Sequence, residues 1–138
     1  MSTAPPRQAV FYNDTAANRF VVNDESLLTN PRTLNPTLKI KIYKRNIIVE
    51  ATQVGELLLT TDKGYRICLK NVYYTPEGTC NILSIPLLQF ANIQFKMEFF
   101  KTYLYYKVGN AETIIATRDH INDNLYKFTF DVAIPKGG

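Results

Sequence analysis

Residues 38–53, LKIKIYKRNIIVEATQ, decide the fold of this chain. From Leu38 to Tyr43 the side chains alternate between apolar and basic or polar, the period-two pattern of a β-strand with one buried face. The polar triplet at 44–46 interrupts the pattern, and a second apolar run begins at Ile47. The stretch therefore predicts a β-hairpin with a charged tip.

Short runs rich in Val, Ile, Thr, Tyr and Phe recur on both sides of this hairpin, and helical periodicity is nearly absent. Two prolines and two asparagines between Thr29 and Pro36 predict a loop, and Val54–Glu56 predicts a bend. Strands near the C-terminal end, at 112–117 and 124–132, are expected to close the sheet. Further strands are expected at 9–13, 20–22, 57–61, 65–69, 71–75, 93–99 and 102–107.

One helix is indicated, after Ser84. Ser84 is a good N-cap, Pro86 suits the first turn, and Asn92 is a suitable stop. Either Asn23 or Asp24 is placed to cap a single helical turn earlier in the chain. The pattern predicts an all-β fold, a small closed barrel with one short helix and a long hairpin.

The chain has 138 residues, enough for one domain with a core of its own. We expect a flexible leader over 1–8, a folded domain over 9–132 and a flexible tail over 133–138. No apolar run approaches the roughly 18 residues that a membrane span needs. The Pro-rich start lacks the apolar region of a signal peptide, so we expect an intracellular protein of the cytoplasm or nucleus, with no membrane partner.

The ligand set for a metal is poor, because Cys68, Cys80 and His120 are the only cysteines and histidine. We expect no metal and no cofactor, no histidine-based triad, and two buried reduced thiols. The net charge is +4, and basic residues crowd the hairpin. A solvated face explains that charge better than a nucleic-acid site, so no direct nucleic-acid partner is expected.

Asp14, Thr15, Ala16 and Ala17 follow the apolar strand 9–13 and form the chemically informative turn. A carboxylate followed by a small hydroxyl residue and two minimal side chains lets another backbone approach the acid closely. The same four residues also suit an ordinary turn or helix cap. The remaining motifs favour the first interpretation.

The ordered motifs resemble the aspartic protease domain of Ty1/copia-type retrotransposon polyproteins, a relative of the retroviral proteases. Its pattern of a strand, Asp-Ser/Thr-Gly-Ala and an Asn-Asp-x-Ser-Leu-like segment matches DTAA at 14–17 and NDESL at 23–27. Its later pattern matches LKNVYYTP at 69–76 and NILSIPLL at 81–88, and NLYKF at 124–128 resembles its Leu-Tyr segment. The resemblance spans nearly the whole chain and implies a retropepsin-like, acid-protease-like barrel.

The resemblance implies an aspartic endopeptidase that acts on a peptide or polyprotein. Since the chain has one such motif, a homodimer would bring one Asp14 from each subunit together. Asp14, Thr15 and Ala16 would form the catalytic turn, and Ala17, Leu83 and Ser84 would support it. The hairpin would be the flap that closes over the substrate. Its tip consists of Tyr43, Lys44, Arg45, Asn46, Ile47 and Ile48.

Two departures from the family pattern keep alternatives open. Ala16 replaces the motif glycine, and it would be strained if its φ were positive. The flap tip lacks glycine, although Asn46 can adopt the left-handed conformation. One alternative is therefore a catalytically impaired, domesticated or decayed pseudo-protease domain that serves in assembly or binding. The other is a basic β-domain that binds RNA.

Overall fold

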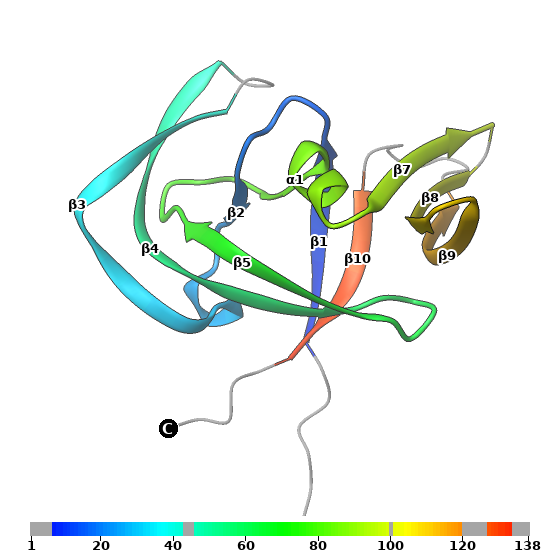
Figure 1. Ribbon diagram of the computed structural model, residues 1–138. Helices are drawn as coiled ribbons and strands as arrows, with labels where there is room; N and C mark the ends of the chain where they lie inside the picture. Colours follow the sequence, from blue (N-terminus) through cyan, green and yellow to red (C-terminus); the bar gives the residue numbers. More distant parts are fainter. Residues whose placement is uncertain (1–6, 43–45, 100, 120–126, 134–138) are drawn as a thin grey trace, which may run out of the picture.

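The computed structural model describes residues 7–42, 46–99, 101–119 and 127–133, and in this part the chain is built from ten strands and two short helices (Figure 1). The all-β class and the single short α-helix are confirmed. In chain order the elements are β1 (Arg7–Asp14), β2 (Phe20–Val22), the 3-10 helix η1 (Glu25–Leu27), β3 (Thr29–Ile42), β4 (Ile47–Thr60), β5 (Arg66–Tyr74), β6 (Asn81–Ser84), α1 (Ile85–Phe90), β7 (Ile93–Glu98), β8 (Lys101–Val108), β9 (Ala111–Asp119) and β10 (Lys127–Val132).

The larger sheet has the strand order β10-β1-β6-β2-β5-β4-β3. β1 runs parallel to β6, and β2 runs parallel to β5. The sheet curls until β10 meets the far end of β4, where Asp131 pairs with Thr60 and Val132 with Leu59. Because this closure is only two residue pairs long and β3 stays outside it, the barrel is less completely closed than the sequence predicted.

A second sheet of three antiparallel strands, in the order β7-β8-β9, follows α1 (Figure 1). It packs on the main core through Ile93, Leu104 and Ile115. The expectation that residues 112–117 close the larger sheet is therefore wrong, since β9 pairs with β8. β10 does belong to the larger sheet, as expected, and it pairs along β1.

β3 and β4 form the predicted hairpin. Their register pairs Ile42 with Ile47 and Lys39 with Glu50. Ile40 and Ile42 are buried whereas Lys39 and Lys41 are exposed, so the alternation read from the sequence is confirmed. The loop predicted from Thr29 to Pro36 is wrong, because this segment belongs to β3. β3 is an edge strand with two breaks in register, and an edge tolerates prolines that cannot donate to a neighbouring strand.

The bend predicted at Val54–Glu56 is a β-bulge inside β4 rather than a turn. Gly55 is needed there because the backbone of β3 approaches β4 closely at this point. A Cβ at position 55 would lie 2.9 Å from the carbonyl oxygen of Thr29, which is a clash with backbone. The long β4 can therefore curve around the core without ending.

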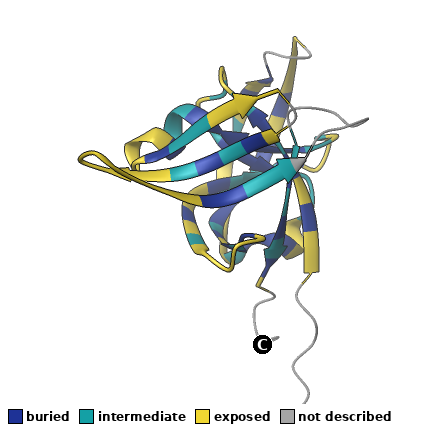
Figure 2. Ribbon diagram, turned by 90° about the vertical axis from the view of Figure 1, so that its right-hand side faces the viewer, coloured by how far each residue is buried: buried dark blue, intermediate teal, exposed yellow. Residues whose placement is uncertain are grey.

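Buried side chains form two clusters, and buried and exposed residues alternate along several strands (Figure 2). The larger cluster contains Phe11, Phe128 and Phe130, whose rings contact one another in edge and stacked geometry. The smaller cluster lies under the hairpin and joins Ile40 and Ile42 to neighbouring strands. The hairpin is thus held down by its own apolar face.

The predicted caps are confirmed. The Asp24 carboxylate accepts a hydrogen bond from the Ser26 amide at the start of η1, and the Ser84 hydroxyl accepts one from the Leu87 amide in α1. Asn92, just beyond α1, has a φ of 61°, the left-handed geometry that ends helices.

The prediction of two buried thiols is wrong. Cys68 is exposed and Cys80 is half-buried, and both are free. Cys68 pairs with Leu58 across β4 and β5, and both residues lie on the outer face while Leu57 and Leu69 are buried. Among the described residues, no helix is long and apolar enough to cross a membrane.

Candidate active site around Asp14

Asp14 is the last residue of β1, and its half-buried carboxylate is held by the turn that follows. Oδ1 accepts hydrogen bonds from the amides of Ala16, at 2.8 Å, and Ala17, at 3.1 Å. Two such bonds fix the orientation of the carboxylate. Oδ2 accepts no hydrogen bond from the part of the chain that the structure describes. The turn therefore leaves Oδ2 of Asp14 able to accept a hydrogen bond from a ligand or a second protein chain.

Ser84 ties this turn to the start of α1. Asp14 pairs with Ser84 in the parallel β1–β6 ladder. The fully buried Ser84 hydroxyl donates to the carbonyl oxygen of Ala17 at 2.6 Å and accepts from the amide of Leu87 at 3.2 Å. Leu83, next to it, is buried in the larger core cluster. One side chain thus links the Asp14 turn, β6 and the helix.

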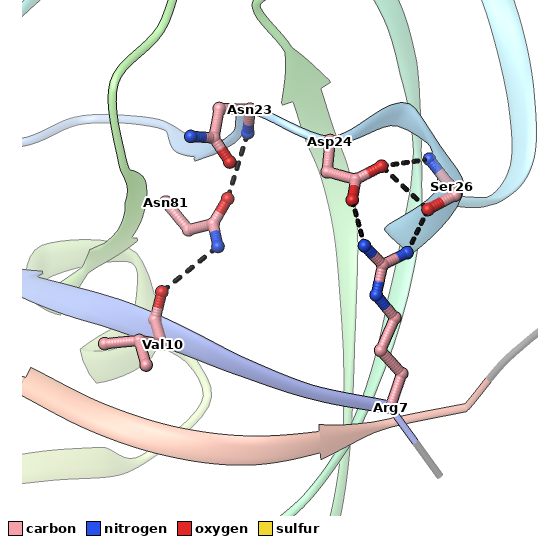
Figure 3. Close-up of polar contacts among 6 residues, drawn as sticks. All are labelled: Arg7, Val10, Asn23, Asp24, Ser26 and Asn81. Carbon is pink, nitrogen blue, oxygen red and sulfur yellow. Dashed lines mark hydrogen bonds and ion pairs between the residues drawn. The ribbon is translucent and has the colours of Figure 1, made fainter. Parts of the chain in front are cut away.

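Asn81 makes a second link in the same strand (Figure 3). Its side-chain nitrogen Nδ2 donates to the carbonyl oxygen of Val10 at 3.1 Å, and its side-chain oxygen Oδ1 accepts from the backbone amide of Asn23 at 2.9 Å. Asn81 is buried, so both bonds are shielded from water. Asn81 begins the motif at 81–88, but its residue type and position in the sequence predict no role for it. The motif was the available signal, while the two partners depend on tertiary pairing.

A charged cluster closes the other end of β1 (Figure 3). The Arg7 guanidinium donates to the Asp24 carboxylate and to the Ser26 hydroxyl, and that hydroxyl donates to Asp24 at 2.7 Å. The Ser26 hydroxyl is the main cause that lowers the pKa of Asp24 below its ordinary value, with Arg7 assisting and partial burial opposing. The cluster therefore favours the charged form of Asp24.

Asp24→Asn tests this cluster. Because the folded-state pKa lies below the unfolded value of 3.8, the stabilisation is present above pH 3.8 and is lost as pH falls through the folded pKa. The pair is more than one-third exposed, so we expect the variant to lose only about 0.5 kcal/mol of unfolding free energy at pH 7. Urea unfolding at several pH values measures this. A difference that grows below pH 3.8 would contradict the assignment.

The hairpin lies directly against the Asp14 turn. A cavity of about 10 Å³, room for roughly one water molecule, separates them. Its wall combines Asp14, Ala17 and Arg19 from the turn and the residues after it with Ile40 and Ile42 from β3. An apolar cover over a carboxylate limits the access of bulk water.

The other residues of the predicted site fall in different places. Thr15 and Ala16 are exposed on the turn. The described non-glycine residues with positive φ are all asparagines, so Ala16 is not strained in the way its methyl group suggested. Asn46 has a φ of 50°, as its sequence position allowed, and Ile47 and Ile48 are exposed. Tyr43, Lys44 and Arg45 lie outside the described residues.

Two residues of this region were missed by sequence reasoning. Arg19 lines the Asp14 cavity, and its guanidinium lies 5.2 Å from the ring centroid of Tyr73. Asn13 is buried, and neither atom of its amide has a hydrogen-bond partner among the described residues. Arg19 gave no signal because its partner is 54 positions away in sequence. Within the described residues, no group of three His, Cys, Asp or Glu side chains is arranged to hold a metal ion.

Fold and site define a strand-rich domain with one carboxylate turn beneath a long hairpin. The family described as Pol polyprotein, beta-barrel domain matches residues 11–93, more than half of the chain. The chain belongs to this family. The match includes the Asp14 turn, the hairpin, Asn81 and Ser84. No solved structure matches the chain.

Proposed function

We propose that this domain is one half of an aspartic endopeptidase that processes a retroelement polyprotein. The observation that carries the proposal is the Asp14 turn. Its carboxylate is oriented by two backbone amides, its loop is tied to Ser84, and it lies under an apolar hairpin. Membership of a Pol polyprotein domain family supports the setting.

The chemistry needs a second carboxylate. In the proposed homodimer, Asp14 of each subunit faces its copy, and the two share one proton because like charges about 3 Å apart cannot both ionise cheaply. One carboxyl group then acts as base toward a water molecule, and the other as acid toward the peptide carbonyl. Thr15, exposed beside Asp14, braces the paired turns in this proposal.

Substrate access requires the hairpin to move. The space beside Asp14 is too small for a peptide, so the hairpin of β3 and β4 must lift from the Asp14 turn and then close over an extended substrate. β3 pairs on one side only, with β4, so its other edge has backbone groups to offer a bound strand. The apolar residues Ile40 and Ile42 would then shield the reacting water.

The test is cleavage of a diverse peptide library at mildly acidic pH, with and without a pepstatin-type inhibitor. The proposal expects cleavage at a restricted set of sites and complete inhibition. Cleavage that the inhibitor leaves unchanged would assign the activity to another protease, and a library left intact at high protein concentration would overturn the proposal.

A pseudo-protease that serves in assembly is the second candidate, and the observation behind it is Ala16 in place of the motif glycine. Ala16→Gly separates the two candidates. Since the Ala16 backbone is not left-handed, we expect the variant to change kcat/KM by less than about threefold. Its free energy of unfolding should fall by about 0.5–1 kcal/mol, because glycine raises the entropy of the unfolded chain. Peptide cleavage and thermal unfolding measure the two effects. Activity found only in the glycine variant would favour the pseudo-protease.

A further inference from the structure

Arg19 is a fixed positive charge beside Asp14. It lies between the Asp14 turn and β2, it is half-buried, and it lines the same cavity as the carboxylate. Its guanidinium lies over the ring of Tyr73 in β5, 5.2 Å from the ring centroid. Tyr73 packs in turn against the cluster beneath the hairpin. The ring therefore holds the cation in place before any ligand arrives.

Among the described residues, no acidic side chain forms an ion pair with Arg19. The ion pairs recorded there join Arg7 to Asp24 and Lys96 to Glu98, and neither includes Arg19. The contact with the Tyr73 ring gives the guanidinium no oxygen acceptor, so its N–H groups can still donate hydrogen bonds to a ligand. Arg19 donates no hydrogen bond to another described residue. Among the described residues, its donors therefore have no acceptor.

The balance of charge around the cavity is positive. Among the described residues that line it, Asp14 is the only acidic one, whereas Arg19 and Lys41 are basic. Lys41 is exposed on β3, at the border where the hairpin meets the Asp14 turn. An extended peptide that passes Asp14 between the turn and β3 would meet both basic residues.

We propose that Arg19 determines specificity, and that the peptides taken by this site carry Asp or Glu within two residues of the cleaved bond. This inference rests on the proposed function. A guanidinium fork binds a carboxylate through two parallel hydrogen bonds, which a neutral amide cannot replace at full strength. A carboxylate bound there would also satisfy donors that have no acceptor in the part of the chain that the structure describes.

The experiment compares two peptides that differ only in Glu or Gln beside the cleaved bond. For the wild-type protein, kcat/KM should favour the Glu peptide by about tenfold at low salt, and the ratio should fall as ionic strength rises. Arg19→Gln should bring the ratio to about one, and Arg19→Lys should keep part of it. Arg66→Gln is the matched control, because it removes an equal charge from β5 outside the Asp14 cavity and should leave the ratio unchanged.

The same peptides, labelled and bound to the Asp14→Asn variant with and without Arg19→Gln, give a readout that needs no cleavage. Cleavage without any Glu preference overturns the inference and leaves the proposed function standing. Absence of cleavage, with a binding preference that Arg19→Gln removes, supports the acidic-peptide site and overturns the protease. If the protein shows neither cleavage nor preferential binding, both the inference and the proposed function are overturned. Matching circular dichroism and melting curves ensure that the Arg19 variants are folded.

Discussion

Asp14→Asn removes peptide cleavage and leaves the fold intact: this is the largest effect that we expect. Asparagine keeps a side-chain oxygen, so it can still accept from the amides of Ala16 and Ala17. It cannot exchange a proton with water, so the acid–base step fails. We expect kcat to fall by at least about 10³-fold, while the melting temperature changes by no more than about 3 °C.

The control for Asp14→Asn is Asp131→Asn, in β10, which removes a charge of the same type far from the turn. This control should cleave at the wild-type rate. Residual cleavage by Asp14→Asn within tenfold of wild type, in a preparation free of other proteases, would show that Asp14 is not the catalytic acid. A large loss of melting temperature would show instead that its role is structural.

Ser84→Ala has the second largest expected effect, and it acts on stability and activity together. The substitution removes the 2.6 Å bond to the Ala17 carbonyl and the cap on Leu87, both in a fully buried position. An unmet buried carbonyl and a lost cap should cost about 1–3 kcal/mol of unfolding free energy. Because the Asp14 turn loses its tether, kcat/KM should also fall by about 10- to 100-fold.

Urea unfolding and peptide cleavage measure the two effects of Ser84→Ala. Thr113→Ala, in β9, removes an exposed hydroxyl and serves as the control for both. An unfolding free energy within about 0.5 kcal/mol of wild type would contradict the role assigned to the Ser84 hydroxyl.

The parts of the fold that were predicted correctly depend on local chemistry. The alternation from Leu38 to Ile42 specified which face of β3 is buried, and Ser84 and Asp24 specified where short helices begin. The loop predicted from Thr29 to Pro36 was wrong, because pairing with β4 at the sheet edge overrides the local preferences of proline and asparagine. Whether β9 joins one sheet or forms another is likewise set by tertiary pairing.

The residues of the candidate site likewise fall into those that the sequence predicted and those that it did not. Asp14 stood out because its residue types are chemically distinctive at the end of a strand. Asn81 and Arg19 did not, because their partners Val10 and Tyr73 are distant in sequence. Cys68 was assigned to the core from residue type alone, whereas the alternation along β5 turns it outward. The contacts of Asn81 and Arg19 thus depend on long-range pairing, which a single sequence does not display.

The central claim is that one Asp14 from each of two subunits makes one active site. Mixing wild-type and Asp14→Asn proteins at constant total concentration, after subunit exchange, tests it most directly. If the site is shared, cleavage falls with the square of the wild-type fraction, so an equal mixture retains about one quarter of the activity. Linear dependence, with about one half retained in the equal mixture, would show that each chain works alone and would contradict the account.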